Sequence, residues 1–130
     1  MTILASGFAL LIAALQGQAY VADGSTLVIR GTAVLLSGID VPDRRSPHGE
    51  AARAEVQTLV ADRVVMCRSS GERRGAMVLA TCTIDGEDLG AMLVERGLAL
   101  DCARDSEGRY RSLEPQGSRE RLTQSAHCNM

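Results

Sequence analysis

The chain has 130 residues, 45% hydrophobic and 23% charged, which is enough for one globular domain. This composition excludes a disordered tail, a collagen-like fibre and a multi-span membrane protein. All 14 basic residues are arginine, and 16 acidic residues give a net charge of −2. Aromatic residues make up 2% of the chain. The chain therefore has neither an excess of basic residues to bind phosphates nor many aromatic rings on which bases could stack, and nucleic acid is not favoured as a partner.

The first nineteen residues have the pattern of a secretory signal. Residues 3–15 are apolar or small and uncharged, and this run of 13 is shorter than the roughly 20 residues that span a bilayer. Gly17 and Ala19 supply the small residues of a cleavage site, so a mature chain would begin at Tyr20. The residues before the run lack the usual positive charge. An uncleaved anchor or a buried first helix is the alternative for residues 1–19.

Residues 20–130 are expected to form a single β-rich domain. Runs of alternating or continuous apolar residues, bounded by glycine turns such as Asp23-Gly24 and Asp85-Gly86, predict the strands. In chain order these runs are 26–30, 33–39, 64–67 and 77–84. Short strands joined by glycine turns fit a small barrel better than a sandwich.

Two helices and a weaker third are predicted between and after these strands. Ser46 as N-cap and Pro47 at the first position predict a helix to about Ala61. Leucines and a methionine at helical spacing predict a second over residues 89–97. A third stretch, 111–122, contains a proline and a glycine that interrupt it. The residue before it, Tyr110, is expected to pack the C-terminal segment against the body.

The cysteine count agrees with export. The four cysteines all lie beyond residue 19, and an even number in a small exported domain predicts two disulfides. Three pairings are open. Cys67–Cys82 is favoured because both lie in apolar runs that flank a glycine-containing loop, and Cys102–Cys128 would then tie down the tail. Metal binding is the alternative, but the chain has no CxxC pair and His127 beside Cys128 is a poor chelate.

Three segments in one consistent order resemble the staphylococcal (thermo)nuclease-like family. They are Val21 to Ile29 (VADGSTLVI), Leu36 to Asp43 (LSGIDVPD) and Gly86 to Leu98 (GEDLGAMLVERGL). The resemblance implies a β-rich α+β fold, a five-stranded OB-fold barrel with two or three packed helices. It also implies the family's calcium-dependent cleavage of phosphodiester bonds, provided that the site residues are kept.

The family's calcium ligands are only partly kept. Asp40 matches one ligand carboxylate, and the Val41 carbonyl could still coordinate a hard cation. Ser25 stands where the resemblance places the other ligand Asp. Asp23, two residues earlier, could contact the ligands without binding the ion itself. The position of the general-base Glu holds Asp43, which is one methylene shorter. Calcium is therefore expected to bind weakly at most, and no other cofactor is expected. The alternative to a cation site is that Asp23 only caps a turn and that the carboxylates of Asp40 and Asp43 face solvent.

Both arginines that clamp the phosphate in the family are missing. The first clamp position is Leu35, and the second, after the loop glycine, is Ala76. Arginine on a transferring phosphoryl group contributes about 10³–10⁵ in rate, so their loss predicts little activity. Neighbouring arginines could replace them: Arg44, Arg45, Arg73 and Arg74.

Two other side chains near these motifs are not expected to act in catalysis. His48 follows Pro47 and is expected at the helix surface or cap. Ser25 is not expected to be a nucleophile, because nothing places a base beside it.

The sequence thus predicts an exported, disulfide-containing pseudoenzyme, periplasmic or secreted, that has lost phosphodiesterase activity and serves as a binding or structural module. It could be an accessory subunit with a protein partner, and would contact the membrane only if residues 1–19 were retained. A weak calcium-dependent secreted nuclease is the alternative.

Overall fold

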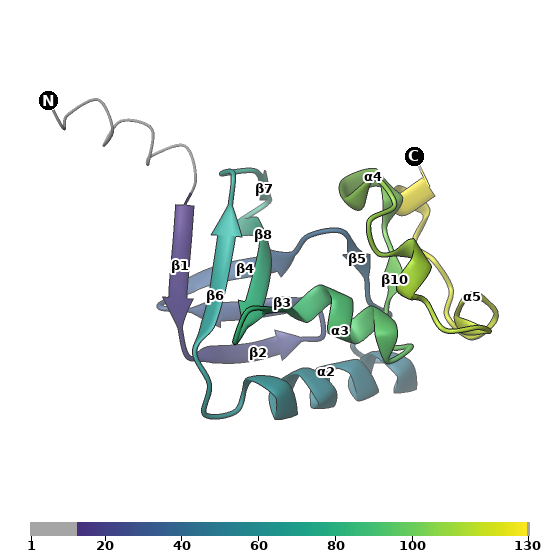
Figure 1. The fold of residues 1–130 in the computed structure, drawn as a ribbon, viewed down its shortest axis with the longest axis horizontal. Coiled ribbons are helices and arrows are strands. Elements are labelled where there is room, and N and C mark those ends of the chain that lie inside the picture. The colour runs from purple at the N-terminus through teal and green to yellow at the C-terminus, as the bar shows by residue number, and fades with distance from the viewer. Residues whose placement is uncertain (1–12, 130) are drawn as a thin grey trace, which may run out of the picture.

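Strands from most of the chain form one curled sheet, shown in Figure 1. The computed structural model describes residues 13–129. The order of the main sheet is β1-β6-β8-β4-β3-β2, with β7 and β9 also paired to β8 and with β5 and β10 forming a separate pair. The strands are β1 (Ala13–Gly17), β2 (Ala19–Asp23), β3 (Thr26–Ile29), β4 (Thr32–Leu36), β5 (Ile39–Asp40), β6 (Val65–Ser69), β7 (Arg73–Arg74), β8 (Met77–Ile84), β9 (Glu87–Asp88) and β10 (Leu100–Asp101).

The two outer strands of the sheet, β1 and β2, are consecutive in the chain and are separated only by Gln18. The sheet therefore curls until the first half of one bent segment pairs with β6 and the second half pairs with β3. Arg30 at the end of β3 fixes the bend, because its Nε donates to the Gln16 carbonyl at 2.7 Å. This curled sheet with few helices confirms the predicted β-rich α+β, OB-like fold.

Two helices cover the sheet. Helix α2 (Pro47–Val60) lies along β2, and α3 (Leu89–Glu95) packs near β8 (Figure 1). The Ser46 side chain caps α2 as predicted, accepting from the Gly49 N–H at 3.0 Å. Asp88 caps α3 in the same way.

Gly49 fixes the loop that precedes α2. A Cβ built at this position would lie 1.8 Å from the Asp43 carbonyl oxygen, so no larger residue fits without moving the backbone. Residues 41–46 are thereby pressed against the first turn of α2. The same loop is also held by the Asp43 side chain, whose Oδ1 accepts from the Arg45 backbone N–H at 2.8 Å.

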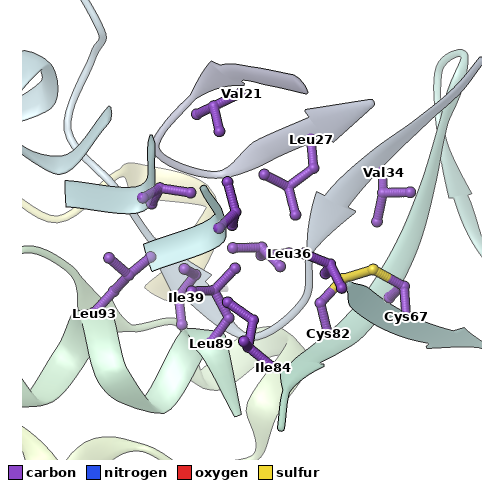
Figure 2. Close-up of a cluster of buried hydrophobic side chains, with 14 of the residues drawn as sticks. Val21, Leu27, Val34, Leu36, Ile39, Cys67, Cys82, Ile84, Leu89 and Leu93 are labelled. Atoms are coloured by element: carbon purple, nitrogen blue, oxygen red, sulfur yellow. A yellow bond between two sulfur atoms is a disulfide. The ribbon is translucent and has the colours of Figure 1, made fainter. Parts of the chain in front are cut away.

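The interior is a single apolar cluster drawn from the sheet and both helices (Figure 2). Leu27, Ile29 and Leu93 are fully buried within it. Cys67 and Cys82 lie directly opposite each other on β6 and β8, with Cα atoms 4.0 Å apart, and their disulfide borders the cluster. The predicted hairpin pairing is confirmed.

The C-terminal region is a lobe of short elements beside β5 and β10. It contains α4 (Ala103–Ser106), η1 (Arg111–Leu113), α5 (Ser118–Arg121) and η2 (Ala126–Asn129), where η denotes a 3-10 helix. The predicted stretch 111–122 is therefore two short helices. The Cys102–Cys128 disulfide, with Cα atoms 4.9 Å apart, closes this lobe as predicted.

Tyr110 joins the lobe to the body, as the sequence predicted. It is 2% exposed, and its hydroxyl donates to Asp88 Oδ2 at 2.6 Å. Its backbone N–H donates to Asp101, a fully buried carboxylate that also accepts from the Ser106 hydroxyl. Burial, followed by the bond to Asp88, raises the pKa of Tyr110 to about 12.

The N-terminal predictions concern a segment that the structure describes only in part. Residues 1–12 of the proposed signal lie outside the described residues. Ala13–Gly17 is strand β1, so the alternative of a buried first helix does not hold over that range. Among residues 13–129, no helix is both long and apolar enough to cross a membrane. Two disulfides indicate an oxidising environment outside the cytoplasm.

Candidate functional site

A hollow of about 190 Å³ lies where β4, β5 and the C-terminal lobe meet. We call it the Asp40 pocket. It brings together four positions that the resemblance assigns to the family's site: Ser25, Leu35, Asp40 and Val41. The rest of its lining is Leu36, Ile39, Arg74, Leu79, Asp105, Ser125 and His127.

Both carboxylate oxygens of Asp40 accept hydrogen bonds from one residue of the C-terminal lobe. The Ser125 backbone N–H donates to Oδ2 at 2.6 Å, and the Ser125 hydroxyl donates to Oδ1 at 2.8 Å. Asp40 is 8% exposed. The negative charge is therefore held by two donors from within the chain.

Asp23 and Ser25 form a closed local turn. Asp23 Oδ1 accepts from the Ser25 N–H at 2.9 Å and from the Ser25 hydroxyl at 3.0 Å. This geometry is that of a turn-capping aspartate, the alternative considered for Asp23.

Asp43 faces a second, neighbouring hollow rather than the Asp40 pocket. This hollow is lined by Asp23, Ser25, Val41, Pro42, Asp43, Arg44 and Arg45. The Asp43 carboxylate accepts from the Arg45 side chain at 3.2 Å, and this contact lowers its pKa. The carboxylate at the predicted base position is thus outside the pocket that contains Asp40.

One arginine reaches the Asp40 pocket, and it comes from β7. Arg74 Nη2 donates to Asp105 Oδ1 at 2.5 Å, and the two side chains are 25% and 12% exposed. Ala76, two residues later, is exposed and lines neither hollow. Of the arginines considered as replacements for the clamps, Arg74 is at the pocket, Arg44 and Arg45 line the second hollow, and Arg73 is exposed.

The fold agrees with a comparison to known proteins. Residues 33–124 match the family described as staphylococcal nuclease homologue. The chain belongs to this family. It is also 34% identical over 110 residues to the succinoglycan biosynthesis protein ExoI of Rhizobium meliloti (strain 1021), an alignment that covers 75% of this chain. The chain spans 58% of the length of that relative.

The family match includes Leu35, Asp40, Asp43 and Ala76 but begins after Ser25. A calcium site needs six to eight oxygen ligands that can face one ion. Here each oxygen of Asp40 already accepts a hydrogen bond from Ser125, Ser25 provides no charge, and Asp43 pairs with Arg45. The residues as arranged do not fit the family's calcium ion.

A second set of possible metal ligands lies at the edge of the pocket. Ligand atoms of Cys102, His127 and Cys128 lie within 4.8 Å of one another. Both sulfurs are joined in a disulfide and so are not available as thiolates.

His48 is exposed at the first turn of α2 and lines neither hollow.

The residues that sequence reasoning missed are those that the C-terminal lobe brings in. Ser125 is 85 positions from Asp40, and Asp105 is 31 positions from Arg74. Neither belongs to a motif. The only signal was the pairing of Cys102 with Cys128, which places the tail near β5.

Proposed function

We propose that this chain is an exported staphylococcal nuclease homologue that acts as a binding or structural module and does not cleave phosphodiester bonds. The observation that carries the proposal is the state of Asp40. The carboxylate that family resemblance assigns to the metal accepts two hydrogen bonds from Ser125 instead. Leucine and alanine at the two clamp positions, Leu35 and Ala76, support the same conclusion.

We further propose that the module resides in the periplasm or is secreted, with its disulfides formed there, and that it needs no cofactor. Calcium would bind weakly at most. Its partner is a protein, and the membrane is a partner only if residues 1–19 are retained. Since the relative in Rhizobium meliloti is named for succinoglycan biosynthesis, we propose an accessory role beside enzymes that build a glycan.

A cleavage assay tests the loss of activity. Purified, oxidised protein is incubated with single-stranded DNA and RNA, with and without millimolar calcium, alongside Asp40→Ala as a control for contaminating nuclease. Asp43→Asn is a matched change to a carboxylate that lies outside the pocket. We expect the protein and Asp40→Ala to give the same background. Calcium-dependent cleavage that disappears only in Asp40→Ala would contradict the proposal.

A weak nuclease is the second candidate, and the observation in its favour is Arg74. Its guanidinium lies at the Asp40 pocket, though it is paired with Asp105. If Arg74 served as a replacement clamp, Arg74→Ala would abolish any cleavage that the assay detects, while Arg73→Ala, an exposed neighbour, would leave it unchanged.

A further inference from the structure

The C-terminal strap, defined here as residues 122–128, lies across the pocket that the family uses for its cation. We propose that this strap is an intramolecular plug of the Asp40 pocket and that the Cys102–Cys128 disulfide is the latch that keeps it in place. Reduction of this one bond would then expose the Asp40 carboxylate while the barrel stays folded. The proposal goes beyond the function proposed above, because it concerns access to Asp40 and not cleavage.

The strap provides hydrogen-bond donors for the carboxylate that it covers. A buried carboxylate is costly unless donors satisfy it. Ser125 provides two donors to the two oxygens of Asp40, at 2.6 and 2.8 Å, from a position 85 residues away. A chain end that only rested on the surface would not need to satisfy both oxygens.

Contacts of the residue before Ser125 hold the strap in position. Gln124 Nε2 donates to the Asp101 carbonyl at 2.8 Å, and Arg119 Nη1 donates to Gln124 Oε1 at 2.7 Å. Arg119 is itself held by Glu114, at 2.7 and 2.8 Å. The strap is thus aligned from one side by a polar network on the lobe.

The Cys102–Cys128 disulfide holds the strap on the other side of Ser125. Cys102 follows β10, which pairs with β5, the strand that carries Asp40. The Cys102 N–H also donates to the Gly38 carbonyl at 2.8 Å. Cys128 is three residues from Ser125, so the latched strap cannot carry Ser125 more than about 10 Å from its anchor.

Opening the latch is a two-electron step. A dithiol reductant would reduce the Cys102–Cys128 bond to two thiols and would itself become a disulfide, with its two protons passing to the cysteine sulfurs. The strap would then be joined covalently to the lobe only through α5 and held otherwise by the hydrogen bonds of Gln124, and the two hydrogen bonds to Asp40 would compete with water. The Cys67–Cys82 bond lies in a different part of the molecule, inside the sheet.

Carbodiimide labelling measures access to Asp40 directly. The protein is treated with a water-soluble carbodiimide and glycine ethyl ester, and each carboxylate is quantified by peptide mass spectrometry. The test variant is Cys102→Ser/Cys128→Ser, and the matched control is Cys67→Ala/Cys82→Ala. Two carboxylates act as internal standards: Asp43, whose side chain is 59% exposed, and Asp101, which is 1% exposed.

We expect labelling of Asp40 to rise about 10-fold in the Cys102/Cys128 variant with Asp101 still protected. The Cys67/Cys82 variant, if folded, should leave Asp40 protected. Equal labelling of Asp40 in the wild-type protein and the Cys102/Cys128 variant would overturn the proposal. These results do not depend on nuclease activity, so failure here and failure of the proposed function are distinguishable.

A second measurement covers the case in which the variant does not fold. Amide hydrogen exchange at Ser125 is followed in the wild-type protein, oxidised and after addition of a dithiol. Slow exchange is expected in the oxidised form, with at least a 10-fold increase after reduction and little change in β8 amides. Fast exchange of Ser125 in the oxidised form would show that no plug exists.

Discussion

Tyr110 is buried between the body and the C-terminal lobe, where its hydroxyl donates to Asp88 at 2.6 Å and accepts from Arg109 at 2.7 Å. The fold favours the neutral phenol and raises its pKa from 10.0 to about 12. A group with a raised pKa gives its full contribution to stability below the unfolded value and loses it as the pH rises to the folded value. The free energy of unfolding should therefore fall by about 3 kcal/mol between pH 10 and pH 12.

The chain makes this prediction easy to check, because it has no lysine and its four cysteines form disulfides. Denaturant unfolding at several pH values from 9 to 12 measures the fall. Tyr110→Phe removes the titrating group and should flatten the profile, at the cost of a lower stability at neutral pH. A profile for Tyr110→Phe as steep as that of the wild-type protein would contradict the assignment.

At the level of single residues, the sequence located one half of the pocket. Ser25 and Leu35 lie close together because β3 and β4 are paired, and strand pairing follows from turn chemistry. Asp40 and Val41 reach the same pocket because β5 follows β4 after the turn at Gly38. Ser125 could not be found in this way. Its position depends on the path of a polar tail fixed by a disulfide, and no local pattern encodes such a path.

Among the elements, the strands with alternating apolar residues were predicted well, and β8 matches its predicted range of 77–84. The run 33–39 is divided into β4 and β5 because Gly38, with φ of 84°, turns the chain before Ile39. Strand β1 was missed because an apolar segment near the N-terminus has the composition of a secretion signal, and composition does not reveal that β6 needs a partner there.

This strand leads to a prediction about processing. A chain beginning at Tyr20 lacks β1, so the backbone of β6 loses the partner that Ala13–Gly17 provides, and Leu15 no longer packs against the core. Loss of this burial and these hydrogen bonds should cost several kcal/mol and lower the Tm by about 10 °C or more. Thermal unfolding of chains starting at Ala13 and at Tyr20 measures the difference.

The full chain and N-terminal sequencing of the exported protein provide the controls. Equal Tm values for the chains starting at Tyr20 and at Ala13 would show that β1 is dispensable. Cleavage after Ala19 and a barrel closed by β1 exclude each other in one mature molecule. Tyr20 as the first residue of the exported protein would therefore mean that β6 is an open edge, available to a partner strand.

Over the whole molecule, charge decides how the domain meets a polyanion. The net charge is −2, and seven arginines form ion pairs with carboxylates: Arg45, Arg53, Arg63, Arg74, Arg96, Arg111 and Arg119. A guanidinium that faces a carboxylate is a poor binder of phosphate, since it must first give up that partner. The other seven arginines, all within residues 13–129, lie outside these pairs, but the 16 acidic residues outnumber all 14 arginines. The molecule therefore has no net positive charge with which to release counterions from a nucleic acid.

We accordingly expect no binding of a fluorescent single-stranded oligonucleotide in an anisotropy titration up to about 100 µM protein at 50 mM salt. At this low salt concentration counterion release is most favourable, so even non-specific binding would be detected. Leu35→Arg/Ala76→Arg is the informative contrast, because it restores a guanidinium at each of the family's clamp positions without changing the strap or the disulfides. This variant should gain measurable affinity that weakens as salt is raised. Tight, salt-dependent binding by the wild-type protein would contradict this expectation. It would mean that arginines paired with carboxylates in the structure bind phosphates instead, and that the domain binds nucleic acid despite its net charge.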